Sequence, residues 1–186
     1  WVAFYAGNAG SMLYITFILA LLVVGVLYYL RKNLREISGY TATILSLMLG
    51  FFVFVLVFYA NPFDKLPVTP PDGQGINPLL VHLGMFFHPP MQMAGLISVV
   101  APFSIVMGTV MAGKSGSDIW VEHGRTWGLV SWLVLTIGLM LGSWWAYTIL
   151  GWGGYWAWDP VENSALMPWL VMTAFVHTVV IQRQRG

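Results

Sequence analysis

The chain has 186 residues, of which 58% are hydrophobic, 16% aromatic and only 8% charged, and its formal net charge is +1. Soluble domains carry roughly a quarter charged residues, so this composition excludes an ordinary soluble fold. The sequence contains no cysteine, which excludes disulfides, thiolate metal sites and a CxxC redox pair within this chain, and so small a charge does not favour nucleic acid.

Five apolar runs are each long enough to cross a bilayer, which takes about 20 helical residues. Every backbone polar group must be paired within its own segment in lipid, so each run is predicted to be an α-helix. The predicted spans are residues 12–30, 40–59, 90–112, 127–150 and 161–181. The sequence therefore predicts an all-α integral membrane protein in which residues 1–186 form a single transmembrane helical unit.

The distribution of Lys and Arg predicts the orientation of these spans. With the N-terminus outside, the inner segments hold seven of the eight basic residues and the outer segments hold only Lys65. The inner residues are Arg31, Lys32, Arg35, Lys114, Arg125, Arg183 and Arg185. The positive-inside rule thus predicts an N-out, C-in topology, with a long outer loop at 60–89 and a short tryptophan-rich outer loop at 151–160. Residues 77–87 of the long loop are expected to form a short helix at the interface.

Tryptophan is concentrated around the short outer loop, where six of the ten tryptophans fall between residues 144 and 169. An interfacial aromatic belt explains a few tryptophans, but not this crowding with glycines between them. Glycines allow close approach of the backbone to a ligand, and indoles supply flat apolar faces. We therefore predict a site for a large planar hydrophobic ligand, with Trp152, Trp156 and Trp158 among its binding residues.

Asp159 and Glu162 resemble an acid–base pair, but their spacing is that of a helix start. Asp at the N-cap, Pro160 at the first helical position and Glu three residues after the cap predict a capping box. We assign both carboxylates to scaffolding, and no catalytic residue is assigned. Because such a cap also holds the tryptophan-rich loop in place, Asp159 is kept among the cofactor-binding candidates.

His88 is a candidate metal ligand on the outer side. It precedes Pro89 and Pro90, and a residue before proline is disfavoured in the α conformation. His88 is therefore predicted to lie at the mouth of the third helix rather than within it, on the same face as the tryptophan-rich loop. His82 and His123 are expected to be solvated.

His177 is the second candidate ligand, because it lies in the inner half of the fifth span, roughly 9 Å along the helix from Arg183. Ionisable residues at this depth are rare and indicate a functional site. Haem is the expected metal centre for a membrane histidine without thiolates. The alternative is a neutral imidazole hydrogen-bonded to a neighbouring helix, with Thr173 as a partner on the same face.

Several motifs together resemble a known family. Trp-Gly-Gly-Tyr-Trp-Ala-Trp-Asp-Pro-Val-Glu-Asn at 152–163, followed by Met-Pro-Trp at 167–169 and His177, is similar to the WWD domain of haem-handling proteins. Within that superfamily the chain most resembles the CcmF family, the haem lyase subunits of cytochrome c maturation system I. Further matching stretches are Asn-Pro-Phe at 61–63, Asn-Pro-Leu-Leu at 77–80, Phe-His-Pro-Pro at 87–90 and Leu-Gly-Ser-Trp-Trp-Ala-Tyr at 141–147. Residues 5–11 match a Trp-Gly stretch of the family only loosely.

The resemblance implies a role for each histidine. His88 would be one of two axial ligands that hold transient haem against the outer WWD loop, and His177 would be one of two ligands of a membrane-embedded b-type haem. The second ligand of each haem would lie beyond residue 186, because family members are longer. The chain, which opens at Trp1, is accordingly expected to be an N-terminal-half fragment or a split-gene subunit.

The resemblance also implies a reaction and partners. Haem vinyl groups would be joined to the cysteine thiols of an apocytochrome c CxxCH motif, with haem arriving on the chaperone CcmE and the apocytochrome on CcmH-type subunits. The remaining CcmF segments would complete the protein in a bacterial plasma membrane or a mitochondrial inner membrane, with the WWD loop on the outer, periplasmic or intermembrane-space, face. The alternatives are a haem export or relay protein, a system II-type cytochrome c synthase, and a structural subunit of a respiratory assembly.

Overall fold

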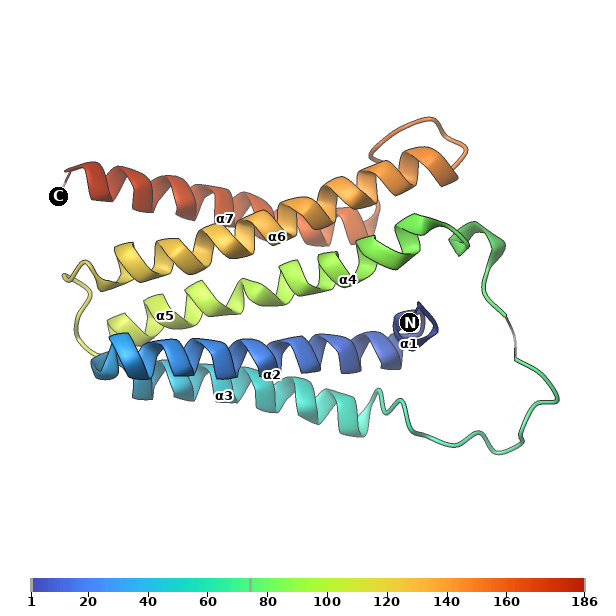
Figure 1. Cartoon of the computed structure of the whole chain (residues 1–186), viewed down its shortest axis with the longest axis horizontal. Helices are drawn as coiled ribbons and strands as arrows, with labels where there is room; N and C mark the ends of the chain where they lie inside the picture. The colour runs from blue at the N-terminus through green and yellow to red at the C-terminus, as the bar shows by residue number, and fades with distance from the viewer. Residues whose placement is uncertain (1, 74, 186) are drawn as a thin grey trace.

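The computed structural model describes residues 2–73 and 75–185, and every regular element within them is a helix (Figure 1). The elements in chain order are α1 (Val2–Tyr5), α2 (Asn8–Asn33), α3 (Arg35–Phe58), the short 3₁₀ helix η1 (Pro78–Leu80), α4 (Leu83–Ser98), α5 (Val100–Met111), α6 (Ile119–Ile149) and α7 (Pro160–Arg185). Among the described residues, five helical segments are long and apolar enough to cross a membrane, with α4 and α5 together forming the third. The predicted all-α fold with five spans is confirmed.

The third span is broken in the middle, which the sequence pattern did not predict. Proline has no N–H, so Pro102 cannot donate to the carbonyl of Ser98, four residues earlier. The hydroxyl of Ser131 on α6 donates to that carbonyl instead, at 2.9 Å. The chain therefore ends α4 at Ser98 and starts α5 at Val100, while a neighbouring helix satisfies the freed backbone group.

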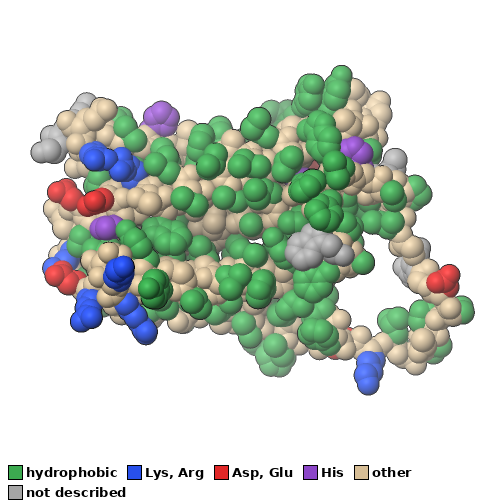
Figure 2. All heavy atoms as spheres, viewed as in Figure 1, with side chains coloured by type: hydrophobic (Ala, Val, Ile, Leu, Met, Phe, Trp, Pro, Cys, Tyr) green, Lys and Arg blue, Asp and Glu red, His purple; other side chains and the backbone are tan. Residues whose placement is uncertain are grey.

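The buried core lies where α2 and α3 meet the α4–α5 span, and it consists of Leu19, Val23, Val26, Leu30, Ile37, Leu45, Ile97, Ala101 and Ile105. Close helix approach at Gly108 supports this packing, because a Cβ there would lie 2.1 Å from the Thr41 hydroxyl oxygen. Helix α6 packs on α4 and α5, and α7 packs mainly on α6 (Figure 1). Apolar side chains cover much of the molecular surface, as expected for helices in lipid (Figure 2).

Helix α1 folds back on the start of α2 through a corner that only glycine permits. A Cβ at Gly10 would lie 1.6 Å from the carbonyl oxygen of Phe4. The hydroxyl of Ser11 donates to the carbonyl of Tyr5 at 2.6 Å, which holds the corner closed. The Tyr5 side chain is thereby buried, with 2% of its surface exposed.

Lysine and arginine side chains gather at the end of the bundle that holds the C-terminus, while the N-terminus lies at the other end (Figures 1 and 2). Lys114 forms an ion pair with Glu36 at this basic end. At the opposite end the long connection from Tyr59 to His82 carries η1, and α4 begins soon afterwards. The expected helix over 77–87 is therefore one 3₁₀ turn followed by the first residues of α4.

Candidate functional site

The polar residues at the start of α7 hold the tryptophan-rich loop, and the predicted capping box is confirmed. The Asp159 carboxylate accepts the N–H of Glu162 at 2.7 Å. The Glu162 carboxylate in turn accepts the N–H of Ala157 at 2.8 Å and that of Asp159 at 3.3 Å. Such reciprocal bonds satisfy the free N–H groups of a helix start and typically stabilise it by about 1 kcal/mol each.

Trp158 adopts a backbone conformation that bulky residues rarely take, with φ at 61°. The bonds of Glu162 fix the N–H groups on either side of it, and the Asn163 side chain donates to the Trp158 carbonyl at 3.0 Å. The polar residues of the Asp-Pro-Val-Glu-Asn stretch are thus used to hold one strained tryptophan in the loop. Backbone strain maintained by several surrounding bonds is typical of functional sites.

His88 lies within α4, so the prediction that it sits at the helix mouth was wrong. The helix begins at Leu83, after His82, whose ring Nδ1 accepts the N–H of Gly84 at 3.0 Å and thereby acts as an N-cap. Both prolines of the His-Pro-Pro motif stand inside the helix. His82 also stacks against Trp144, with ring centroids 5.1 Å apart, so it is a structural residue rather than a solvated one.

A pair of glycines on α6 brings the His88 ring against the backbone of that helix. A Cβ at Gly142 would lie 2.6 Å from Cε1 of His88, and one at Gly138 would lie 2.7 Å from the amide oxygen of Gln92. Small residues four apart allow helices in membranes to approach this closely. The resulting contact places Nδ1 of His88 at 2.9 Å from the carbonyl oxygen of Gly138.

This hydrogen bond determines which nitrogen of His88 can bind a metal. A carbonyl oxygen only accepts hydrogen bonds, so Nδ1 of His88 must carry the hydrogen. In the neutral ring, Nε2 then holds the free lone pair. A histidine that donates its other N–H to a backbone carbonyl is the usual arrangement of a metal-ligating imidazole.

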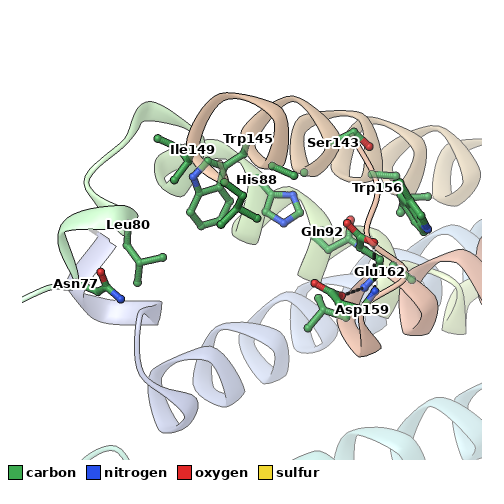
Figure 3. A pocket seen from close by; sticks show the side chains of 16 residues that line it. Asn77, Leu80, His88, Gln92, Ser143, Trp145, Ile149, Trp156, Asp159 and Glu162 are labelled. Carbon is green, nitrogen blue, oxygen red and sulfur yellow. Dashed lines mark hydrogen bonds between the residues drawn. The ribbon is translucent and has the colours of Figure 1, made fainter. Parts of the chain in front are cut away.

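His88 lines a cavity of about 390 Å³ between α4, α6, η1 and the start of α7 (Figure 3). Trp145, which the sequence interpretation did not single out, packs on His88 with ring centroids 5.6 Å apart. Asp159 and Glu162 face these two rings across the cavity, and Trp156 is part of the lining (Figure 3). A cavity of this size with aromatic walls and few polar groups is typical of a cofactor or small-molecule site.

Two of the predicted tryptophans do not line this cavity. Trp152 is 49% exposed and donates to the carbonyl of Gly154 within its own loop at 2.8 Å. Trp158 is 69% exposed and packs edge-on against Trp156, with centroids 5.9 Å apart. The structure therefore brings together His88, Trp156 and Asp159 and leaves Trp152 and Trp158 exposed, away from the cavity lining.

His177 is exposed on α7 and is remote from the cavity. It lies 18 residues after Asp159, which is about 27 Å along the helix axis at 1.5 Å per residue. The alternative considered for His177, a hydrogen bond to Thr173, is not what the structure shows: Thr173 donates to the Trp169 carbonyl and accepts the indole N–H of Trp132, each at 2.8 Å.

Helices α6 and α7 are joined by a reciprocal pair of indole bonds. Trp132 donates to Thr173 at 2.8 Å, and Trp169 donates to Thr136 at 2.7 Å in the opposite direction. The two indoles stack with centroids 6.0 Å apart. Pro168 lies inside α7 directly before this clamp and interrupts the backbone hydrogen bonds of the helix.

His123 also has a defined partner, contrary to the expectation that it is solvated. Its Nδ1 lies 2.7 Å from the hydroxyl oxygen of Tyr29, and the two rings pack edge-on. Both residues lie at the end of the bundle away from the cavity, so this pair is separate from the His88 site.

The cavity residues fit a porphyrin better than a bare metal ion. No three His, Asp or Glu side chains gather to hold an ion anywhere in residues 2–73 and 75–185. A single imidazole is sufficient for porphyrin iron, whose four equatorial positions are supplied by the cofactor itself. Three buried atoms of cavity-lining residues find no hydrogen-bond partner among the described residues: the amide oxygen of Gln92 and the indole nitrogens of Trp145 and Trp156. Two of these atoms, the indole nitrogens, are hydrogen-bond donors, which match the carboxylate acceptors that a porphyrin such as haem carries.

Comparison with known proteins identifies the family. The family model described as cytochrome C assembly protein matches residues 5–186. The chain belongs to the cytochrome c assembly protein family.

Curated relatives extend this match over nearly the whole chain. The chain is 42% identical to the cytochrome c-type biogenesis protein NrfE of Haemophilus influenzae, over 99% of this chain and 29% of that protein. It is 41% identical to the cytochrome c-type biogenesis protein CcmF of the same organism, over 99% of this chain and 28% of that protein. This member of the assembly family thus spans less than a third of the length of these relatives.

A solved structure has the same fold. The cytochrome c haem lyase CcmF superposes with a TM-score of 0.82 and 33% identity, covering all of this chain and 28% of that one. Together with the five apolar helices, this likeness supports a multi-pass membrane protein. The resemblance of the sequence motifs to the CcmF family is confirmed.

Proposed function

We propose that this chain is the haem-holding part of a cytochrome c haem lyase, with the cavity beside the tryptophan-rich loop as the outer haem site. The observation that carries the proposal is the His88 imidazole, whose Nδ1 is committed to the Gly138 carbonyl while its ring lines the cavity. Its Nε2 then offers a lone pair to porphyrin iron. The family and the CcmF relatives support haem as the cofactor.

The residues around His88 act by orientation rather than by acid–base chemistry. When bound, haem supplies the vinyl groups to which the cysteine thiols of an apocytochrome CxxCH motif add. His88 would hold the iron, while the indoles of Trp145 and Trp156, which line the same cavity, would supply apolar contacts to the bound haem. Asp159 and Glu162 keep the loop in place through their backbone bonds. Holding two reactants in a productive geometry accounts for a large part of such a rate enhancement.

His177 is proposed as a ligand of a second, membrane-embedded b-type haem. Its imidazole is exposed on α7, where an uncompensated polar group in lipid would be costly. About 27 Å of helix separates it from Asp159, so the two histidines serve different haem groups. The other ligand of each haem would come from the part of the full-length protein outside this chain.

The sidedness and partners of the site follow from the same proposal. The end of the bundle with the cavity would face the periplasm, because the opposite end holds most of the lysine and arginine residues (Figure 2). The haem chaperone CcmE would deliver haem to this end, and CcmH-type subunits would present the apocytochrome c. The name of the relative CcmF, a cytochrome c-type biogenesis protein, is consistent with such a maturation pathway.

The experiment uses the full-length protein and removes one imidazole at a time. We expect His88→Ala to abolish low-spin binding of added haemin and the attachment of haem to an apocytochrome c, while His177→Ala removes the b-type haem spectrum. His123→Ala is the matched control, since its imidazole contacts Tyr29 at the other end of the bundle. A His88→Ala protein that still matures cytochrome c at the wild-type rate would overturn the proposal. A protein that carries haem but never forms the covalent product would instead be a relay.

A further inference from the structure

Two successive carbonyls of α4 lack the donors that a helix normally provides. The carbonyl of residue i accepts the N–H of residue i+4, and proline has no N–H. Pro89 and Pro90 therefore leave the carbonyls of Met85 and Phe86 unpaired within their own helix. Both carbonyls belong to the turn that leads directly into His88.

The phenol of Tyr5 donates to this pair of carbonyls from the far end of the sequence. Its oxygen lies 2.7 Å from the Met85 carbonyl oxygen and 3.2 Å from that of Phe86. The α1 corner, closed by Gly10 and Ser11, brings it there. Burial, and to a lesser degree the neighbouring Tyr14, raise the pKa of the Tyr5 phenol above its usual value near 10. The hydroxyl therefore keeps its hydrogen throughout the physiological range.

We propose that Tyr5 is a positioning residue for His88, acting through the two carbonyls that Pro89 and Pro90 release. The proposal rests on the function proposed above, in which His88 binds haem iron. The Tyr5 hydroxyl holds the turn before His88 closed. This turn sets the position of the imidazole along the axis of α6. In this position Nδ1 of His88 lies 2.9 Å from the Gly138 carbonyl oxygen, and the ring fits beside Gly142.

The chain offers a matched control in a second tyrosine that contacts the same helix. The hydroxyl of Tyr14 lies 3.4 Å from the carbonyl oxygen of Pro90. That carbonyl has a regular helical donor, because residue 94 is alanine and carries an N–H. Tyr14→Phe therefore removes the same chemical group without leaving a carbonyl unpaired, whereas Tyr5→Phe leaves two.

The experiment measures haemin binding by the full-length protein with Tyr5→Phe, Tyr14→Phe or His88→Ala. We expect Tyr5→Phe to weaken haemin binding by about 10- to 100-fold, the usual effect of losing a residue that orients a metal ligand. The low-spin imidazole spectrum should be lost with it, and millimolar free imidazole should restore that spectrum. Tyr14→Phe should bind as the wild type does. Because the Tyr5 phenol stays protonated, the ratio of the wild-type haemin affinity to that of Tyr5→Phe should not change between about pH 6 and pH 9.

A rescue variant separates positioning from general damage to the fold. Replacing Pro89 and Pro90 with alanine in the Tyr5→Phe background returns an N–H to each freed carbonyl, so haemin affinity should recover. If Tyr5→Phe binds haemin like the wild type, or if the alanine pair fails to restore its binding, the positioning role is overturned while the His88 site stands. If His88→Ala itself binds haemin normally, the proposed function fails instead.

Discussion

At the scale of single residues, the site depends on two glycines of α6 that leave room for the His88 ring. Gly138 and Gly142 have no side chains, and only for that reason can the His88 imidazole donate to a backbone carbonyl of α6. The indoles of Trp145 and Trp156 then supply the apolar walls. The tautomer of His88 is thus fixed by the packing of two helices rather than by a neighbouring acid.

The substitution Gly142→Ala tests this packing. The new Cβ would lie 2.6 Å from Cε1 of His88, so the ring must move and lose its bond to Gly138. Overpacking of this kind costs about 1–3 kcal/mol, and we expect a corresponding loss of haemin affinity in the full-length protein. Gly50→Ala is the control, because a Cβ there meets nothing within 4 Å. If the two variants bind haemin with equal affinity, the close packing at Gly142 does not hold His88 in place.

At the scale of helices, each proline removes one backbone N–H, so the carbonyl four residues earlier needs a hydrogen-bond donor from another helix. Pro102 ends α4 by freeing the Ser98 carbonyl, and Ser131 on α6 takes its place as donor. Pro89 and Pro90 do the same for Met85 and Phe86, with Tyr5 as the donor. In both cases the interruption of one helix is compensated by a hydroxyl of another, which ties the helices together at a defined register.

Ser131→Ala should therefore destabilise the bundle more than an exposed serine change does. It leaves the Ser98 carbonyl without a donor, and interhelical hydrogen bonds in membrane proteins contribute about 0.6 kcal/mol on average. We expect a lower melting temperature in detergent, whereas Ser46→Ala, at an exposed position on α3, should leave it unchanged. Adding Pro102→Ala should recover the loss, because it returns the missing N–H. No recovery would mean that Ser131 acts through other contacts.

The sequence pattern was sufficient for features that depend on neighbours along the chain. Apolar run length predicted the five spans, and the Asp-Pro-Val-Glu spacing predicted the capping box at Asp159. Features that depend on distant segments were missed. Local rules placed His88 at a helix mouth because they cannot detect Tyr5, 83 residues earlier in the chain. Trp145 was likewise overlooked, since only the packing of α4 on α6 shows that its ring contacts His88.

At the scale of the whole molecule, the two ends of the bundle differ in charge and chemistry. The basic side chains gather at the end with the C-terminus, while the cavity and the tryptophan-rich loop lie at the other (Figures 1 and 2). The positive-inside rule then predicts that the cavity and the tryptophan-rich loop face away from the cytoplasm.

Cysteine labelling tests this orientation, because the natural chain contributes no thiol of its own. Asp72 in the connection before α4 and Ser115 between α5 and α6 are both exposed. A membrane-impermeant maleimide applied to spheroplasts should label Asp72→Cys and should label Ser115→Cys only after permeabilisation. The reverse pattern would show that the cavity faces the cytoplasm.

Helix α7 begins directly after Asp159 and carries His177 in its second half, with Pro168 between these two residues. A helix bends most readily where proline removes a backbone bond. The Trp132–Trp169 clamp fastens α7 immediately after that point. We therefore expect any bend of α7 to be centred between its first two turns and the Trp132–Trp169 contact, so that a change in the angle of the Asp159 end would leave the position of His177 unchanged.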